Sequence, residues 1–457
     1  MARYQCPPPD FAETRAGRTL HVWGNVPHWL VADAELTDAL AILQHEKPLR
    51  DAAESLSVKS QRPARRVLKD LRPILRSLYK AGVLRKNGRA AERRPPRPAR
   101  LEVVCINLTN RCNLRCTFCF NDASRTRAAE ELSAAEVLRF LKDVRPWLAR
   151  RPLLALMGGE PLLAGDRLLA VARGTGRRWE KLVSTNGLLV DDAFAHGARD
   201  TGLQVQVSVD GAGPESHERI RGKGTFARAT DAVGRLARAG AHAIMSMVAH
   251  RDNQGEIGAY LDLALGLGAS EARVIPLKRV GAGKNAGLAM PDMRRLLGDT
   301  LRAVEGRPER GRLLGRDYLS LLAQTCARSY RRTTCGTGSQ TILLDADGTV
   351  YPCQNHCAPE LAAGNIREHA FREIFEGPVL AHLRATCHVD RLPACAKCPV
   401  RYWCMGGCRG EAYNVAGRFD APSATCAMNR EAILETFWLL AESAVVRDLA
   451  GARQGHY

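Results

Sequence analysis

The chain has 457 residues and a formal net charge of +19, and 45% of its residues are hydrophobic. This length exceeds that of one typical domain, so we expect two or three domains. No apolar run approaches the roughly 20 residues of a membrane span, and the N-terminal residues lack the charged and apolar regions of a signal peptide. We therefore expect a cytoplasmic protein without a membrane partner.

The fifteen cysteines are an odd number, and most of them stand in short clusters. A disulfide framework spreads its cysteines along the chain. In a reducing cytoplasm the clustered pattern indicates metal ligation instead.

The basic charge is unevenly distributed. Residues 59–100 contain fifteen Lys or Arg against only Asp70 and Glu92, which leaves +13 in that stretch. This is typical either of a solvated helix followed by a basic linker or of a surface for an acidic partner. Aromatic residues are sparse and no nucleic-acid-binding motif accompanies the charge, so we expect no nucleic-acid partner.

The first segment predicts a β-hairpin followed by three helices. Residues 19–32 look like two short strands around the turn pair Gly24-Asn25. Asp33 is placed to cap one helix and Pro48 to start a second. The third helix keeps an apolar stripe over residues 67–79 until Gly82 ends it.

This arrangement resembles the winged-helix peptide-binding domain of RiPP maturation systems, the RiPP recognition element. The resemblance covers about residues 15–86 and rests on pattern rather than on a motif, so a plain helical adaptor is the alternative. We expect this domain over residues 1–86. A Pro- and Arg-rich linker follows over residues 87–100.

From residue 101 strands alternate with helices, a pattern typical of a parallel sheet. The predicted strands cover residues 102–109, 153–157, 181–185, 203–209, 242–248 and 272–276, with helices such as those over residues 134–148 and 226–239 between them. Along residues 203–210, apolar side chains alternate with Gln204, Gln206, Ser208 and Asp210. Such alternation is expected of a strand whose inner face lines an active site.

The strongest chemical signal follows the first of these strands. Cys112, Cys116 and Cys119 form a CxxxCxxC triad, and iron–sulfur clusters are held by cysteine thiolates, usually four to a cubane. Three thiolates leave one iron open for a substrate or cosubstrate. Phe118 adds an apolar ring able to shield a cluster. A zinc site or buried structural cysteines are the alternatives.

With Phe118 the triad reads CxxxCxFC, which resembles the signature of the radical SAM superfamily. The resemblance implies an α/β fold, a partial (β/α)6 TIM-like barrel over residues 101–310. In that family the open iron of a [4Fe–4S] cluster chelates S-adenosyl-L-methionine. The ligand-bearing loops fall at the carboxyl ends of strands, where α/β folds place their sites.

Further stretches resemble the family's loops that contact this cosubstrate. The implied contacts are Gly158, Gly159, Glu160 and Pro161 to the amine, and Ser184, Asn186, Ser208 and Asp210 to the ribose and carboxylate. Residues 217–222 resemble the family's HDxxRG-like stretch, with Glu218 in place of Asp. There Arg221, or else Arg219, would pair with the carboxylate.

The last third of the chain holds a second strong signal, seven cysteines whose spacing resembles that of the SPASM domain, expected over residues 311–430. Although a CxxC pair alone favours zinc, this longer pattern does not. The resemblance implies one auxiliary [4Fe–4S] cluster on Cys395, Cys398, Cys404 and Cys426, and most of a second one on Cys335, Cys353 and Cys408. Candidates for the remaining ligand are Cys326, Cys357 and Cys387, unless that iron is open. Cys6 and Cys105 are expected to be ordinary thiols.

Three smaller features complete this region. Residues 341–351 predict a hairpin that turns at Gly348. Gln354 stands where sulfatase-maturing relatives carry an acidic base, which disfavours that activity. A helix over residues 432–446, within a C-terminal segment of residues 431–457, is expected to pack on the barrel or, as the minor alternative, to dock a partner.

Together these features predict an enzyme that reductively cleaves S-adenosyl-L-methionine and oxidatively modifies a ribosomal precursor peptide, forming a crosslink, thioether or related bond. The peptide would bind through its leader, and an external one-electron reductant, flavodoxin or ferredoxin, would supply the electron. Alternatives are a maturase of a protein-derived cofactor and a small-molecule radical SAM dehydrogenase. An iron–sulfur electron-transfer or sensor protein is the alternative of another class, although it needs no cosubstrate pocket.

Overall fold

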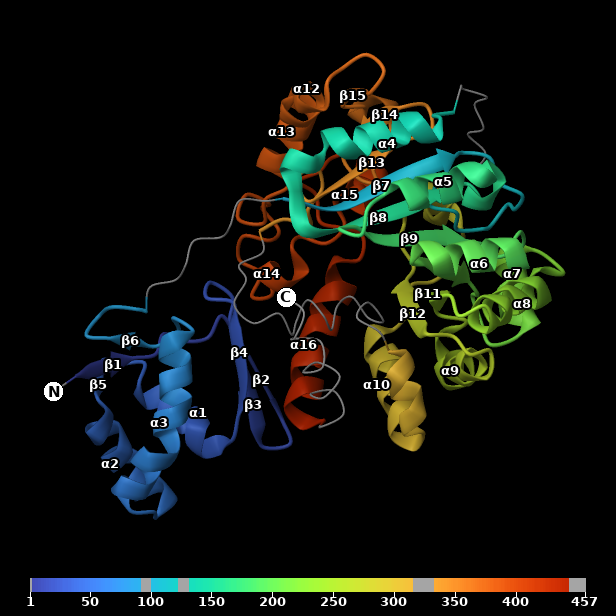
Figure 1. The fold of residues 1–457 in the computed structure, drawn as a ribbon. Coiled ribbons are helices and arrows are strands. Elements are labelled where there is room, and N and C mark those ends of the chain that lie inside the picture. The colour runs from blue at the N-terminus through green and yellow to red at the C-terminus, as the bar shows by residue number, and fades with distance from the viewer. Residues whose placement is uncertain (1, 92–99, 122–130, 315–332, 444–457) are drawn as a thin grey trace.

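The computed structural model describes residues 2–91, 100–121, 131–314 and 333–443 (Figure 1). Most of the predicted linker, Cys326 and the end of the predicted C-terminal helix lie outside these ranges. None of the helices in the described ranges combines the length and the apolar character that crossing a membrane requires.

The first segment contains the predicted hairpin and three helices within a larger arrangement. Its elements are β1 (Arg3–Gln5), β2 (Phe11–Arg15), β3 (Arg18–Trp23), β4 (His28–Ala32), α1 (Ala34–Ile42), β5 (Lys47–Pro48), α2 (Leu49–Ser60), α3 (Ala64–Lys80) and β6 (Arg85–Lys86). The side chain of Asp33 accepts from the Leu36 amide at 2.8 Å, so the predicted cap of α1 is confirmed.

The hairpin is one part of a three-stranded antiparallel sheet in the order β2-β3-β4, which we call the N-terminal sheet. Sequence analysis missed β2, because its five residues are largely polar and carry little strand signal. The apolar stripe of α3 is confirmed: Val67, Leu71, Leu75 and Leu78 are buried against α1 and α2.

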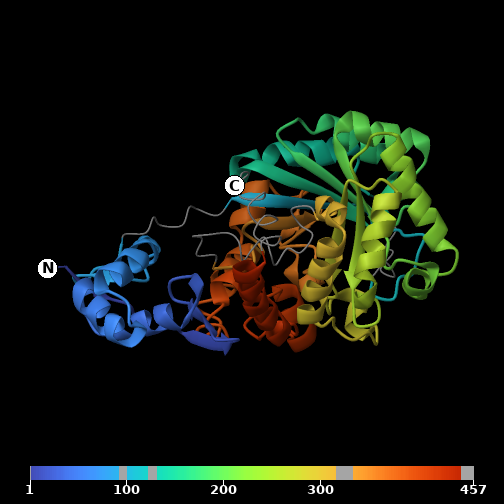
Figure 2. The ribbon, with the colours of Figure 1, turned by 90° about the horizontal axis from the view of Figure 1, so that it is seen from below.

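The central segment is a parallel sheet with helices along its outer side (Figures 1 and 2). Its elements are β7 (Leu101–Thr109), α4 (Ala134–Asp143), β8 (Leu148–Gly158), α5 (Asp166–Gly174), β9 (Glu180–Thr185), α6 (Asp192–Thr201), β10 (Leu203–Ser208), α7 (Pro214–Arg221), α8 (Thr225–Arg238), β11 (Ala243–Ala249), α9 (Ile257–Gly266), β12 (Glu271–Pro276) and α10 (Met293–Gly306). All six predicted strands are confirmed. Strand β8 begins earlier than predicted, because α4 ends at Asp143.

The cysteine-rich segment continues the same sheet. Its elements are β13 (Thr341–Leu344), β14 (Thr349–Tyr351), β15 (Gly364–Asn365), α12 (Phe371–Glu376), α13 (Pro378–Thr386), α14 (Arg401–Cys404), α15 (Arg409–Ala416) and α16 (Cys426–Glu442). The predicted hairpin is β13-β14, and Gly348 adopts φ +92° at its turn. Strand β13 pairs in parallel with β7, so this segment is joined directly to the barrel.

Helix α16 lies between the N-terminal sheet and α10 (Figure 1). Ala432 and Leu440 join the barrel core, so the predicted packing on the barrel is confirmed. Phe437 and Trp438 instead pack against the N-terminal sheet. The helix therefore ties the first and the central segments together.

Candidate active site

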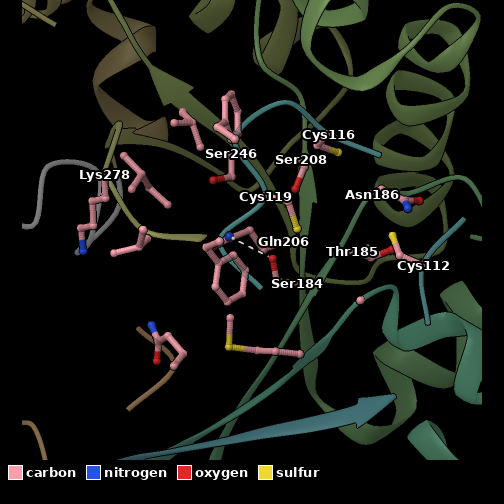
Figure 3. A pocket seen from close by; sticks show the side chains of 18 of the residues that line it. Cys112, Cys116, Cys119, Ser184, Thr185, Asn186, Gln206, Ser208, Ser246 and Lys278 are labelled. Atoms are coloured by element: carbon pink, nitrogen blue, oxygen red, sulfur yellow. Dashed lines mark hydrogen bonds between the residues drawn. The ribbon is translucent and has the colours of Figure 1, made fainter. Parts of the chain in front are cut away.

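A cavity of about 260 Å³ opens at the carboxyl ends of the barrel strands. Cys112, Cys116 and Cys119 all line it, and none of them forms a disulfide. Figure 3 shows these three cysteines on one side of the cavity and Lys278 on the opposite side. Three free thiols converging from one loop on one cavity are the donor set that a cluster with an open iron requires.

The cysteine loop is held in place by the barrel. The Thr117 amide donates to the Ile220 carbonyl at 3.1 Å, and the Ala282 amide donates to the Cys119 carbonyl at 2.8 Å. Phe118 is buried with Ile220 and Leu277 and also lines the cavity. Its ring therefore makes part of the cavity wall apolar, beside the three thiols.

The Gly158-Gly159 pair allows the end of β8 to lie against the end of β7. A Cβ atom on either glycine would come within 2.1 Å of a backbone oxygen, that of Thr109 or that of Arg111. The amides of Gly159 and Glu160 each donate to one of these two oxygens at 2.8 Å. Only glycine fits here, so this loop approaches the cysteine loop closely.

Glu160 joins two strand ends rather than standing free in the cavity. Its buried carboxylate accepts from the Thr185 hydroxyl at 2.7 Å, the Asn186 amide at 2.8 Å and the Leu162 amide at 3.0 Å. Burial raises the pKa of this carboxyl, and the three hydrogen bonds oppose that rise. Gly158, Gly159 and Glu160 line the cavity, whereas Pro161 is not among its lining residues.

The carboxyl ends of β9 and β10 supply further polar groups. Ser184, Asn186 and Ser208 line the cavity, and the Asn186 side chain donates to Asn113 of the cysteine loop at 2.7 Å. Gln206 donates to Ser184 at 3.4 Å (Figure 3). Of the four polar residues predicted for the inner face of β10, Gln206 and Ser208 line the cavity, whereas Gln204 and Asp210 do not.

Arg221 lies between the cysteine loop and Asp210. Its Nε donates to the fully buried Asp210 carboxylate at 2.5 Å, and its Nη1 lies 3.7 Å from the Cys116 sulfur. Arg221 lines the cavity, whereas the buried Asp210 does not; the Asp210 carboxylate also accepts from the Val248 amide at 2.8 Å. Arg219 is half-exposed and faces Asp252 at 3.7 Å, away from the cavity.

His217 holds the loop that carries Asp210. Its ring is fully buried, and Nδ1 accepts from the Asp210 amide at 3.0 Å, which requires an unprotonated Nδ1. Burial lowers the pKa of His217 to about 4, and the nearby Arg221 contributes to that shift. The imidazole is therefore neutral in the folded protein at pH 7.

We predict that acid destabilises the protein partly through His217. Because the folded pKa lies below the unfolded one, the unfolded chain binds more protons between the two values, and stability is lost as pH falls from about 6.5 towards 4. At pH 5 this costs about 2 kcal/mol. Thermal unfolding of wild-type and His217→Asn protein from pH 5 to 8 checks this. The variant keeps an acceptor without a titrating ring, so an unchanged pH slope would contradict the role of His217.

The cysteine-rich segment brings four thiols close enough for their charges to interact: Cys395, Cys398, Cys404 and Cys426. Burial and the neighbouring thiols raise the pKa of Cys404 to about 12. The Cys398 amide donates to the Cys395 carbonyl at 2.8 Å, which closes the CxxC turn. The structure thus brings together the four cysteines predicted to bind one auxiliary cluster.

A second group of thiols whose charges interact consists of Cys335, Cys353 and Cys408. Of the candidates for a fourth ligand, buried Cys387 lies near both Cys335 and Cys353. The Cys357 sulfur is 3.4 Å from the Gln354 carbonyl oxygen, and Cys326 lies outside the described ranges.

In the part of the chain that the structure describes, no three His, Cys, Asp or Glu side chains converge tightly enough to hold one metal ion. A four-iron cluster binds each thiolate through a separate iron, so a wider set of thiols suits it.

Lys278, two residues after the end of β12, also lines the cavity and was not predicted from the sequence. Glu160 and Arg221 are the other Asp, Glu, Lys or Arg side chains of its lining, and each is already engaged by the protein. A lysine without a motif gives no signal by itself; its position after a barrel strand was the only indication. A second cavity of about 380 Å³ adjoins the first and is lined by Lys284. The two cavities share Phe120, Val280, Gln354 and Asn355.

Comparisons with known proteins agree with this geometry. The profile of the radical SAM superfamily matches residues 106–264, and that of the SPASM iron–sulfur cluster-binding domain matches residues 335–399. The chain is 30% identical to the PqqA peptide cyclase of Rhizobium meliloti over 331 residues, which are 71% of this chain and 86% of that protein. It is 28% identical to the mycofactocin maturase MftC of Mycolicibacterium smegmatis over 71% of this chain and 82% of that protein.

Two solved structures share the fold. Native anSMEcpe with bound AdoMet and Cp18Cys peptide aligns with a TM-score of 0.62 and 18% identity, over 77% of this chain and 99% of that one. Streptococcus suis SuiB bound to its precursor peptide SuiA aligns with a TM-score of 0.56 and 12% identity, over 92% of this chain and 98% of that one.

Proposed function

Because the chain belongs to the radical SAM superfamily, we propose that it cleaves S-adenosyl-L-methionine reductively and uses the resulting 5′-deoxyadenosyl radical to modify a ribosomal precursor peptide oxidatively. The observation that carries this proposal is that one cavity is lined by three free thiols and by the carboxyl ends of β8, β9 and β10. When bound, a [4Fe–4S] cluster supplies the electron for this cleavage.

The residues of the chain hold and orient the reactants. Cys112, Cys116 and Cys119 would hold the cluster, and because the motif supplies only three thiolates, one iron would be open to the cosubstrate. Gly158, Gly159 and Glu160 receive its amine, while Ser184, Asn186 and Ser208 contact its ribose and carboxylate, with Arg221 as the cation. Asp210 and Pro161 do not line the cavity and act indirectly. Asp210 positions Arg221, and Pro161 begins the turn that follows Glu160.

The two cysteine groups of the last third would hold auxiliary clusters, and such clusters would supply sites for electron transfer. Cys395, Cys398, Cys404 and Cys426 bind one of them. Cys335, Cys353 and Cys408 bind the other, with Cys387 the best placed of the described candidates for the remaining ligand. An external one-electron reductant, flavodoxin or ferredoxin, reduces the radical cluster.

The peptide reaches the radical through the second cavity. The second cavity lies between the barrel loop at Lys284 and residues Asn355 and Tyr413 of the cysteine-rich segment. It shares lining residues with the first cavity. The names of two relatives, a peptide cyclase and a maturase, and the peptide-bound neighbours favour a peptide substrate. A maturase of a protein-derived cofactor remains the second candidate, because the mycofactocin maturase is among these relatives.

The test is to measure 5′-deoxyadenosine from reduced, reconstituted protein, together with the mass of the precursor encoded beside its gene. We expect release of 5′-deoxyadenosine and a peptide that has lost hydrogen atoms. An iron–sulfur electron carrier or sensor would release none. Release without any change in the precursor would favour a small-molecule dehydrogenase.

We also predict that the auxiliary site can be separated from cleavage. Replacing Cys398 or Cys404 by alanine should remove about four irons and block the finished product, yet leave cosubstrate cleavage at least partly intact, because neither residue lines the cavity. Iron analysis and product assays check this, with Cys6→Ala as the control for loss of a buried thiol elsewhere. Normal product from Cys404→Ala protein would contradict it.

A further inference from the structure

We infer that the N-terminal sheet is a structural part of the auxiliary site of Cys395, Cys398, Cys404 and Cys426. In this view the sheet covers the Cys398 and Cys404 side of that site, while Cys426 is exposed. Docking of the sheet and occupancy of the site stabilise each other. The inference rests on the proposed function for its ligand assignment. It adds a role for the first segment that peptide recognition does not require.

The first contact is a turn seated on a ligand loop. A Cβ atom on Gly24 would lie 2.6 Å from the Pro399 carbonyl oxygen and 2.8 Å from its Cα. Pro399 directly follows Cys398. Any side chain at position 24 must therefore push the hairpin turn away from the backbone that carries this ligand.

The second contact is a shared guanidinium. Arg401 is buried, and it donates both to the Asn25 side chain at 2.6 Å and to the Cys398 carbonyl at 3.2 Å. Asn25 is itself held by Asp10 at 3.3 Å. One side chain thus links the hairpin turn to the backbone of a ligand residue.

The third contact is an apolar core common to the two segments. Leu20 and Val22 of β3 are fully buried with Val400 and Phe437, and the side chains of Cys398 and Cys404 pack against this cluster. Trp29 of β4 stacks on Phe437 with ring centroids 4.7 Å apart. Contacts between domains within one chain are usually more polar than this, so we expect the two segments to move as one body.

The edge of the contact between the N-terminal sheet and the cysteine-rich segment involves α16, the helix that begins at the proposed ligand Cys426. Helix α16 starts at Cys426, and on it Glu435 pairs with Arg15 at 2.9 Å. The Trp438 indole donates to Glu13 at 3.0 Å. The N-terminal sheet therefore contacts the segments that carry Cys398, Cys404 and Cys426.

The environment around a metal site controls solvent access and tunes the metal. Removing this cover should expose the cluster to water and chelators. The coupling is reciprocal, because any interaction that links two equilibria acts equally in both directions. Loss of the cluster should therefore loosen the sheet.

The experiment compares Gly24→Val with Gly176→Val in the reconstituted full-length protein. Gly176 is an exposed barrel glycine whose added Cβ would meet nothing within 4 Å, so it controls for the substitution itself. We expect bathophenanthroline to remove about four irons from Gly24→Val protein at least tenfold faster than from wild type. Cleavage to 5′-deoxyadenosine should continue in both variants. Equal release rates from the two variants would overturn the inference.

Two further measurements keep the test decisive. Asn25→Ala loses the side-chain hydrogen bonds to Arg401 and Asp10 without adding an atom that would displace the turn. A smaller acceleration of iron release is therefore expected, even if Gly24→Val protein fails to fold. Hydrogen exchange of β3 and β4 should become faster in Cys404→Ala protein than in wild type, and unchanged exchange would refute the reciprocal coupling. The iron count of Cys404→Ala protein tests the ligand assignment separately, because it does not depend on Gly24.

Discussion

Replacing Cys112, Cys116 and Cys119 together by alanine is expected to abolish cleavage of S-adenosyl-L-methionine and to lower the iron content by about a third, from about twelve to about eight atoms. The three thiols line one cavity with Gly158, Gly159, Glu160 and Arg221, so no other cysteine of the described residues is placed to substitute for them. The remaining irons are expected on the two cysteine groups of the last third, which consist of different cysteines.

Three measurements check this result: iron analysis, the visible absorption of the reduced protein and 5′-deoxyadenosine release. Cys6→Ala is the matched control, because Cys6 is a buried thiol in the core formed by α1, α2 and α3. That variant should keep both its irons and its activity. Cleavage retained by the triple variant would show that the radical cluster lies elsewhere, and loss of all iron would show that the three groups are not independent.

Much of the barrel was predictable because its signals are local. Alternation of apolar and polar side chains along residues 203–208 identified β10, and the motifs at strand ends meet at one cavity because parallel strands end on the same side of the sheet. The capping residue Asp33 and the turn glycine Gly348 were likewise found from local chemistry.

The contacts that join the segments were not predictable, because they depend on pairings between distant residues. Nothing in the sequence of β13 indicates that it pairs with β7. Trp29 and Phe437 are both typical core residues, and only the fold shows that they stack on each other. Glu160 was predicted from its motif, whereas its hydrogen bonds to Thr185 and Asn186 join residues that are 25 and 26 positions apart and were not predicted.

Helix α3 has a basic face through which peptide binding by the first segment can be tested. Arg65, Lys69, Arg72, Arg76 and Lys80 follow one another at intervals of three or four residues, so they share one face of the helix. All five are exposed, and within the described ranges none of them forms an ion pair. We propose that this face, which we call the basic stripe, attracts an acidic leader that pairs with an open edge of the N-terminal sheet.

The open edges of the N-terminal sheet differ from those of the predicted two-stranded hairpin. Strand β2 pairs along β3, so the edge strands of this sheet are β2 and β4. Deleting residues 1–100 would be a poor test of leader binding, because it would also uncover Val400, Phe437 and the packed sides of Cys398 and Cys404. Substitutions on α3 avoid this problem, since its basic side chains are exposed and its buried residues belong to a different core.

Changing Lys69, Arg72 and Arg76 together to glutamate is therefore expected to weaken binding of the full-length precursor by about 10- to 100-fold at low salt, mainly through slower association. Added salt should reduce the difference between variant and wild type, because exposed charges are screened. Uncoupled 5′-deoxyadenosine release and iron content should stay unchanged. The matched control is Arg139→Glu, Lys142→Glu and Arg145→Glu around α4, which makes the same charge change on exposed barrel residues. Equal weakening of binding in both triple variants would show that only the net charge of the protein matters. Undiminished binding in the α3 variant would show that the basic stripe does not attract the leader, and the first segment would then serve only as a structural cover.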